Sequence, residues 1–278
     1  MTLANLADLA RQRAARHEGL GAFNVIHLEH AETFVAAAEQ AGQPIVLQIS
    51  ENAVKYHGGL APLAAGTLAA ARSASVPVVV HLDHAESVAL IAEAVCLGFT
   101  SVMYDGAKLP FDENLATTRD VVRACHAQGV SVEAELGEVG GKDGAHAPGV
   151  RTDPDQARQF VEQTGVDLLA VAVGSSHAMT DRNADLDTDL IGRLADAVPV
   201  PLVLHGSSGV SDDGMRAAIQ AGMTKVNVST HLNVVFTDVV RQVLASNPAL
   251  VDTRKYVRPA FDAASAEVER LLRWYAAA

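Results

Sequence analysis

The stretch Val78-Val79-Val80-His81-Leu82-Asp83-His84 begins as an apolar strand and ends in ionisable side chains, and an alanine-rich helical pattern follows it. The same unit, a short strand and then a helix, recurs along the whole chain. The strand candidates are residues 21–26, 45–50, 78–83, 101–105, 131–136, 168–173, 202–205 and 225–228. Helical patterns lie near residues 31–41, 60–74, 86–97, 113–128, 155–164, 187–197, 212–221 and 231–245.

This alternation predicts an α/β fold in which helical crossovers connect parallel strands. Eight units fit a (β/α)8 TIM barrel. A doubly wound open sheet is the alternative, but no GxGxxG motif opens the first unit. Polar residues also close nearly all the strands, and a barrel gathers those ends into one ring. We therefore expect a single barrel domain over residues 1–278.

The segment after Asn247-Pro248 departs from the repeat. Residues 256–278 form a helical tail whose apolar face includes Val268, Leu271, Leu272 and Trp274. Such a face predicts an extra C-terminal helix that packs on the barrel or on another subunit, so we expect a homodimer or homotetramer.

Composition restricts the classes of protein. The chain has 278 residues, 49% of them hydrophobic, and a formal net charge of −12, which argues against nucleic acid or an anionic membrane as partner. It contains no run of about 18 apolar residues, and its first residues lack a basic segment followed by an apolar one. We expect a soluble, cytoplasmic protein. Cys96 and Cys125 lie in helical patterns and are predicted to be reduced core thiols.

A glycine-rich segment interrupts the repeat after the fifth strand candidate. Residues 137–149 contain five glycines, namely Gly137, Gly140, Gly141, Gly144 and Gly149, and few residues that favour a helix or strand. Long loops without regular structure in a compact domain are usually functional or disordered. We expect a mobile lid around residues 137–152.

Three histidines follow three of the predicted strands, namely His84, His177 and His205. Catalytic zinc uses three protein ligands and leaves one position open, and neutral imidazole supplies such a set without adding charge. The sequence therefore predicts a zinc site. Glu135 is a candidate fourth or alternate ligand, and Glu133, on the same strand face, could orient a ligand histidine. Spacing does not tell which glutamate has which role.

The polar residues that close the strands define the candidate active site, because barrel enzymes place it at the C-terminal ends of their strands. These residues are Asn24, Ser50, Asp83, His84, Asp105, Glu133, Glu135, His177, His205, Asn227, Ser229 and Thr230. The loops Gly206-Ser207-Ser208-Gly209 and Asn227-Val228-Ser229-Thr230 follow the last two strands. Barrels frequently bind phosphate there, although two ordinary tight turns are the alternative.

Five ordered motifs resemble the zinc-dependent class II ketose-bisphosphate aldolases, which include fructose- and tagatose-bisphosphate aldolases. The motifs are His81-Leu82-Asp83-His84, Ser101-Val102-Met103-Tyr104-Asp105-Gly106, Val132-Glu133-Ala134-Glu135-Leu136-Gly137, Leu204-His205-Gly206-Ser207-Ser208-Gly209 and Lys225-Val226-Asn227-Val228-Ser229-Thr230. The likeness runs from Gly21 to Tyr256 and so covers nearly the whole chain.

The resemblance implies roles for these residues. His84, His177 and His205 would hold zinc, Glu135 would approach the metal, and Asp83 would transfer a proton at the aldehyde oxygen. Phosphate would lie among Gly206, Ser208, Asn227, Ser229 and Thr230, together with a sodium or potassium ion, while Asn24, Ser50 and Asp105 would touch the substrate. The activity implied is reversible cleavage of a phosphorylated ketose to dihydroxyacetone phosphate and an aldehyde. The sequence does not fix which ketose.

Three departures from the family pattern bear on this transfer. The family has a glutamate base in a Gly-Gly-x-Glu-Asp lid, whereas this lid reads Gly140-Gly141-Lys142-Asp143-Gly144, so Asp143 would be the base. Ala178 replaces a glycine that follows the second zinc histidine. Ala85-Glu86 and Gly106-Ala107 stand where glycine and serine are usual. A zinc-dependent barrel hydrolase and a non-catalytic ligand-binding homologue remain the alternative functions.

Overall fold

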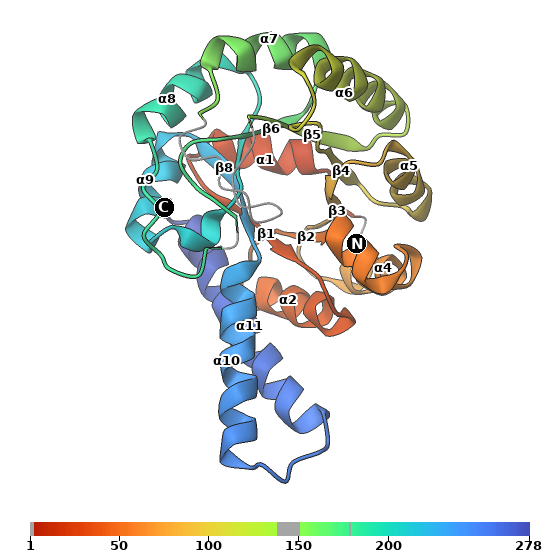
Figure 1. The fold of residues 1–278 in the computed structure, drawn as a ribbon, viewed down its shortest axis with the longest axis vertical. Coiled ribbons are helices and arrows are strands. Elements are labelled where there is room, and N and C mark those ends of the chain that lie inside the picture. The colour runs from red at the N-terminus through yellow and green to blue at the C-terminus, as the bar shows by residue number, and fades with distance from the viewer. Residues whose placement is uncertain (1–2, 138–150, 178) are drawn as a thin grey trace.

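The computed structural model describes residues 3–137, 151–177 and 179–278. Its centre is a closed barrel of parallel strands that pair in chain order, with β8 returning to β1 (Figure 1). The strands are β1 Leu20–Asn24, β2 Ile45–Ser50, β3 Val78–Ala85, β4 Ser101–Tyr104, β5 Ser131–Leu136, β6 Leu168–Val171, β7 Leu202–Leu204 and β8 Met223–Val228. The predicted (β/α)8 barrel is thus confirmed, with strand ends that differ by up to two residues.

Helices surround the barrel (Figure 1). They are α1 Leu6–Ala14, α2 Leu28–Ala41, α3 Glu51–His57, α4 Ala61–Ser73, α5 Val88–Leu97, α6 Phe111–His126, α7 Pro154–Thr164, α8 Thr188–Ala197, α9 Asp212–Ala221, α10 Thr230–Ser246 and α11 Arg254–Tyr275, with a 3-10 turn, η2, at Ser207–Gly209. Side-chain caps fix several helix starts: Asp153 accepts from the N–H groups of Asp155 and Gln156, and Ser211 from that of Gly214.

Helix α1, which the strand and helix pattern did not predict, contributes to the interior of the barrel. Leu6 and Ala10 are fully buried and pack with inward-facing strand residues such as Leu20, Val79 and Leu168. The N–H of Ala7 also donates to the Ser131 hydroxyl of β5 at 3.3 Å. Because these apolar side chains cover the barrel interior from one side, polar chemistry is left to the other end, where the strands finish.

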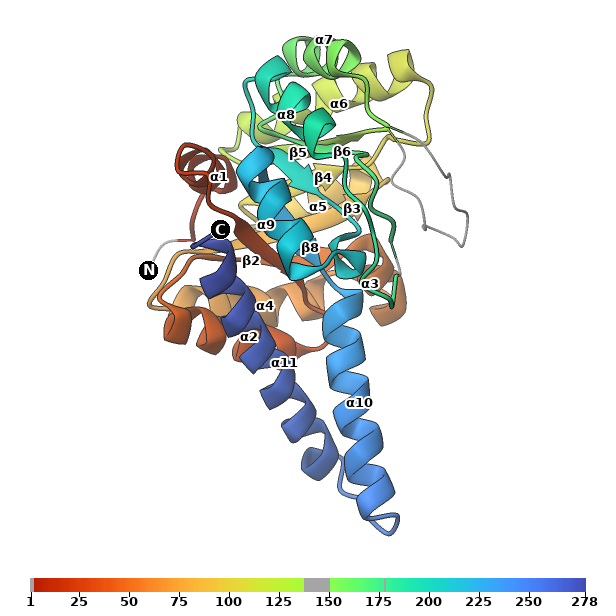
Figure 2. The same cartoon turned by 90° about the vertical axis from the view of Figure 1, so that its left-hand side faces the viewer.

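The last two helices extend away from the barrel as a hairpin (Figure 2). The C-terminal half of α11 packs on the barrel through buried residues that include Val268, Leu271 and Leu272, which confirms the predicted extra C-terminal helix. In α10, by contrast, Leu232 is the buried residue, and Val234 is 36% exposed.

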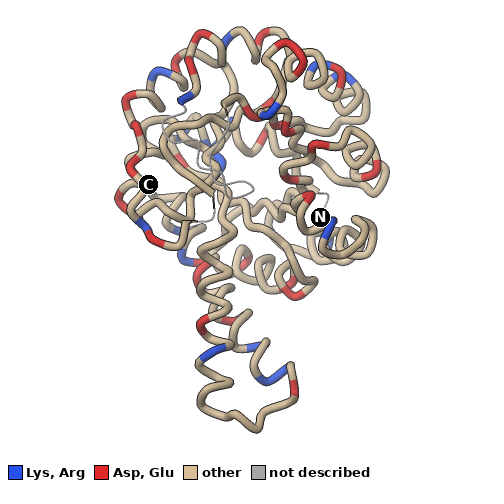
Figure 3. The backbone as a smooth tube through the Cα atoms, viewed as in Figure 1, with Lys and Arg blue, Asp and Glu red and all other residues tan. Residues whose placement is uncertain are grey.

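Two further sequence expectations can be compared with the structure. Cys125 is buried, but Cys96 is exposed, so the prediction that both are core thiols was wrong for Cys96. The buried face of α5 is formed by Ile91 and Ala94, and Cys96 lies off that face. Acidic and basic residues are interspersed along the outer helices (Figure 3). Within the described ranges, no helix combines the length and hydropathy needed to cross a bilayer.

Candidate active site

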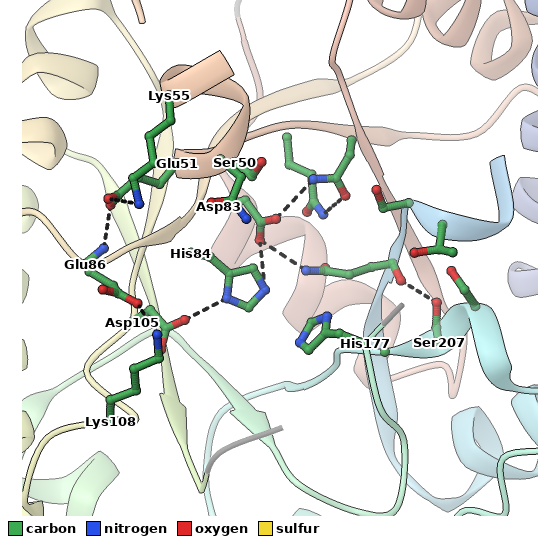
Figure 4. A pocket seen from close by; sticks show the side chains of 18 residues that line it. Ser50, Glu51, Lys55, Asp83, His84, Glu86, Asp105, Lys108, His177 and Ser207 are labelled. Carbon is green, nitrogen blue, oxygen red and sulfur yellow. Dashed lines mark hydrogen bonds and ion pairs between the residues drawn. The ribbon is translucent and has the colours of Figure 1, made fainter. Parts of the chain in front are cut away.

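A cavity of about 420 Å³ opens where the strands end. Figure 4 shows that its side chains come from many different strand ends and from the loops that follow them. The lining includes the predicted catalytic residue Asp83 and the predicted metal ligands His84 and His177. It also includes all the predicted substrate-binding residues, which are Asn24, Ser50, Asp105, Gly206, Ser208, Asn227, Ser229 and Thr230. His205 and Glu135 are fully buried below this surface.

A β-bulge in β3 places two consecutive side chains in the cavity. Successive residues of a regular strand point to opposite faces. Here the pairing with β4 shifts by one residue between Leu82 and Ala85, and His84 has φ 51°, in the left-handed region. Asp83 and His84 therefore both line the same cavity. A left-handed conformation is uncommon for a residue with a side chain, which indicates that the surroundings hold His84 in place.

The three predicted histidine ligands converge. His84, His177 and His205 each offer a ring nitrogen, and these atoms lie within 4.8 Å of one another. The ring centroids of His84 and His205 are 4.5 Å apart, and those of His84 and His177 are 5.2 Å apart. Three imidazoles match the donor set of a catalytic first-row divalent metal, which binds them in their deprotonated form. His84 also forms a second such group with Asp105 and Glu135.

Two glutamates of β5 orient His205. Its Nδ1 lies 2.8 Å from Glu135 Oε2 and its Nε2 lies 3.0 Å from Glu133 Oε1. Burial opposes protonation, but the hydrogen bonds and charges of the two glutamates outweigh it and raise the pKa of His205 to about 9. A ring nitrogen that binds a metal must lose its proton, so metal binding here would displace one. Both glutamates thus contact His205, and Glu135 is the one whose carboxylate also lies within 4.8 Å of donor atoms of His84 and Asp105.

A buried lysine compensates the charge of Glu133. Lys225 of β8 is fully buried, and its Nζ lies 2.9 Å from Glu133 Oε2. Burial opposes ionisation of Glu133, but Lys225 and His205 outweigh it and hold the pKa of the carboxyl far below its usual range. Lys225 also donates to Asn227 Oδ1 at 2.7 Å. Lys225 is thus surrounded by Glu133 and Asn227 and does not line the cavity, whereas a Schiff-base lysine must reach its substrate.

Asp83 is held by two amides that come from the neighbouring strands β1 and β8. Asn24 Nδ2 and Asn227 Nδ2 each donate to one of its oxygens at 3.2 Å, and Gln48 Nε2 in turn donates to Asn24 Oδ1 at 2.8 Å. Burial opposes ionisation of Asp83, but the charges of His84 and Lys225 outweigh it and lower the pKa of the carboxyl. Asp83 is therefore an ionised, oriented carboxylate that can accept a proton.

The loop after β7 packs tightly against the loop that carries His177. Gly206 has φ 66°, and a Cβ there would lie 2.7 Å from backbone atoms of Ser176. Ser175 Oγ donates to the carbonyl of His205 at 2.6 Å. Farther along, Ser207 Oγ donates to the carbonyl of Asn227, and Ser208 Oγ accepts from the N–H of His231 at 3.1 Å. The two loops predicted to bind phosphate are thus joined to each other and to the start of α10.

Sequence reasoning also missed some residues of the site. Gln48 and Lys225 orient the amides that hold Asp83, and Glu51, Lys55 and Lys108 line the outer cavity. Gln48 could have been found as a polar residue inside the apolar strand Ile45–Ser50. Lys225 is part of one of the five motifs, but that motif indicates no partner for it. Asp143, Ala178 and most of the expected lid lie outside the described residues.

Comparison with known proteins identifies close relatives over the whole chain. The family model for class II fructose-bisphosphate aldolase matches residues 4–278. A fructose-bisphosphate aldolase of Geobacillus stearothermophilus is 38% identical over 272 residues, which cover 96% of this chain and 95% of the relative. A 6-phospho-5-dehydro-2-deoxy-D-gluconate aldolase of Bacillus subtilis (strain 168) is 34% identical over 284 residues, 100% of this chain and 97% of the relative. Among solved structures, the YdjI aldolase of Escherichia coli K12 has a TM-score of 0.83 at 30% identity and covers 99% of this chain and 97% of its own.

Proposed function

This chain belongs to the class II fructose-bisphosphate aldolase family, and from that membership we propose that it catalyses zinc-dependent, reversible aldol cleavage of a phosphorylated ketose. The products would be dihydroxyacetone phosphate and an aldehyde such as glyceraldehyde 3-phosphate. The observation that carries the proposal is the convergence of three imidazoles beside an ionised, doubly hydrogen-bonded carboxylate, Asp83.

His84, His177 and His205 would hold the zinc ion, with Glu135 as a further ligand. When bound there, the ion would supply Lewis acidity at the ketone and hydroxyl oxygens of the substrate. Glu133 would keep His205 oriented through Nε2, an arrangement common for ligand histidines. Lys225 in turn would keep Glu133 ionised in a fully buried position.

The proton transfers would be carried out by two aspartates. In the cleavage direction, Asp83 would accept the proton of the C4 hydroxyl as the C3–C4 bond breaks, and the aldehyde carbonyl would form on the C4 side. The electron pair of that bond would remain on the dihydroxyacetone phosphate half as an enediolate. Asp143 would return a proton to its carbon and, in the condensation direction, remove that proton.

The substrate phosphate would lie among Gly206, Ser208, Asn227, Ser229 and Thr230, with a sodium or potassium ion as a further partner. Backbone N–H groups at η2 and at the start of α10 favour an anion there. Asn24, Ser50 and Asp105 would contact the sugar hydroxyls. Fructose 1,6-bisphosphate and tagatose 1,6-bisphosphate are the leading substrates, and 6-phospho-5-dehydro-2-deoxy-D-gluconate, named for two relatives, is the third.

The proposal is tested with purified protein, a chelator, re-added Zn²⁺ and a panel of these three substrates, with release of dihydroxyacetone phosphate as the readout. We expect His205→Ala to lose bound zinc and cleavage together. His126→Ala is the matched control, because His126 is 43% exposed on α6. Undiminished cleavage by metal-free protein would refute zinc dependence. Release of inorganic phosphate without release of dihydroxyacetone phosphate would indicate a zinc-dependent hydrolase. Zinc-loaded protein that turns over none of the substrates would indicate a non-catalytic binding homologue.

The role of Asp143 is tested separately by exchange of the C1 hydrogen of dihydroxyacetone phosphate with solvent. We expect Asp143→Ala to slow this exchange by at least about 100-fold, the usual contribution of a positioned base. Exchange at the rate of the parent protein would assign the base to another group.

A further inference from the structure

Four charged side chains form a continuous arc on the rim of the cavity. Lys55 Nζ of α3 lies 3.0 Å from Glu51 Oε1, and Glu51 Oε2 accepts from the backbone N–H of Glu86 at 2.8 Å. Glu86 Oε1 lies 3.1 Å from Lys108 Nζ, which belongs to the loop after β4. The arc therefore connects three separate strand-to-helix connections, and all four residues line the cavity.

The arc and the candidate phosphate loops lie on different sides of the reacting groups. In Figure 4, Asp83, His84 and Asp105 lie between the arc, with Lys55 and Lys108, and the side that carries His177 and Ser207. A ketose whose first phosphate is bound beside Ser207 and whose central carbons face Asp83 must direct its far end toward the arc. The far end is the part that leaves as the aldehyde.

Neither Glu51 nor Glu86 would be left buried and unpaired if its lysine turned to a ligand. Glu51 is 14% exposed, but it keeps the backbone N–H groups of Glu86 and Ser87 as donors at 2.8 and 3.3 Å. Glu86 is 50% exposed and can be solvated. Lys55 and Lys108 are themselves 65% and 45% exposed. Ion pairs this exposed contribute little to stability, whereas hydrogen bonds from ammonium groups to an anionic ligand are comparatively strong.

We propose that Lys55 and Lys108 bind the anionic group at the far end of the substrate and select aldehydes that carry one. The inference rests on the proposed aldol cleavage and adds its specificity-determining residues. The chain carries a net charge of −12, so an anion at the cavity mouth needs such a local positive site. The far end is a phosphate in a ketose bisphosphate and a carboxylate in the deoxygluconate compound. The shared chemistry is an anionic group at the end of the aldehyde half that lies opposite the carbonyl carbon.

The test measures kcat/KM for condensation of dihydroxyacetone phosphate with three aldehydes. Glyceraldehyde 3-phosphate carries a phosphate, 3-oxopropanoate carries a carboxylate, and glyceraldehyde is neutral. For Lys55→Met and for Lys108→Met we expect the ratio of kcat/KM between the preferred anionic aldehyde and glyceraldehyde to fall about tenfold, through KM. Lys108→Arg should recover part of the loss. Arg123→Met, which removes an 81% exposed cation of α6, should leave the ratio unchanged.

The outcomes separate the two proposals. A higher kcat/KM of the parent for glyceraldehyde 3-phosphate or for 3-oxopropanoate identifies the terminal anion. Equal losses for charged and neutral aldehydes, or no loss in either lysine variant, would overturn the assignment of the arc. A selective loss in Lys255→Met instead would move the anion site to the start of α11. Absence of C1 hydrogen exchange in the zinc-loaded parent, measured without any aldehyde, would refute the aldolase proposal itself.

Discussion

Replacing Lys225 by Met tests whether the buried charge network stabilises the barrel. The substitution removes the ammonium 2.9 Å from Glu133 Oε2 and leaves a fully buried carboxylate. Breaking one side of a buried pair typically costs about 3–5 kcal/mol. His205 remains 3.0 Å from Glu133 Oε1, so we expect the lower end of that range, about 3 kcal/mol. For a chain of this size each kcal/mol lowers Tm by about 2–4 °C, which gives a decrease of roughly 6–12 °C.

The assay is thermal unfolding followed by circular dichroism at pH 7 with chelator present, so that metal binding does not contribute to Tm. Lys255→Met, an exposed lysine of α11, is the matched control and should change Tm little. In Lys225→Met with Glu133→Gln, removal of both charges should recover part of the loss, and the double-mutant cycle gives the coupling. A single variant that melts within about 1 °C of the parent would contradict the reasoning, because its predicted decrease is several times larger.

Three further outcomes follow from the site and the core. Asp83→Asn should still bind zinc, as measured by elemental analysis, but a coupled assay should show kcat for cleavage lowered by about 100-fold or more. Undiminished cleavage would remove Asp83 from the mechanism. Gly206→Ala should destabilise the protein by about 1–3 kcal/mol, because residue 206 has a left-handed φ and the new methyl group would collide with the backbone of Ser176. The same change should raise KM for the phosphorylated ketose. An unchanged urea midpoint together with an unchanged KM would contradict this. Burial and the nearby His27 lower the pKa of His30 from 6.5 to about 4, so between these pH values the folded state binds fewer protons than the unfolded state. The free energy of unfolding should therefore fall by up to about 3 kcal/mol as the pH falls from 6.5 to about 4. Denaturant titrations of His30→Gln should show a smaller fall than those of the parent. An equal fall in both would assign the effect to another group.

The sequence alone predicted the class of fold and most of the residues that line the cavity. Strands such as Val78–Ala85 are short apolar runs, and the helices between them have a 3.6-residue period, so both are encoded by neighbouring residues. Since a (β/α)8 barrel brings the ends of all its strands to one face, the polar residues that close the strands could be assigned to one cavity before any contact was known. The three histidines were found in this way.

Only the tertiary structure decided how those residues act on one another. The bulge and the φ of 51° at His84, which bring Asp83 and His84 to the same cavity, depend on the register between β3 and β4. The hydrogen bond between Asn227 and Asp83 joins residues 144 positions apart, and it exists because closure of the barrel brings β8 to β1. Helix α1 was missed, and so were Lys55 and Lys108 as a pair on the cavity rim. Spacing along the chain encodes local periodicity, whereas contacts of this kind arise from strand register and barrel closure, which no local pattern specifies.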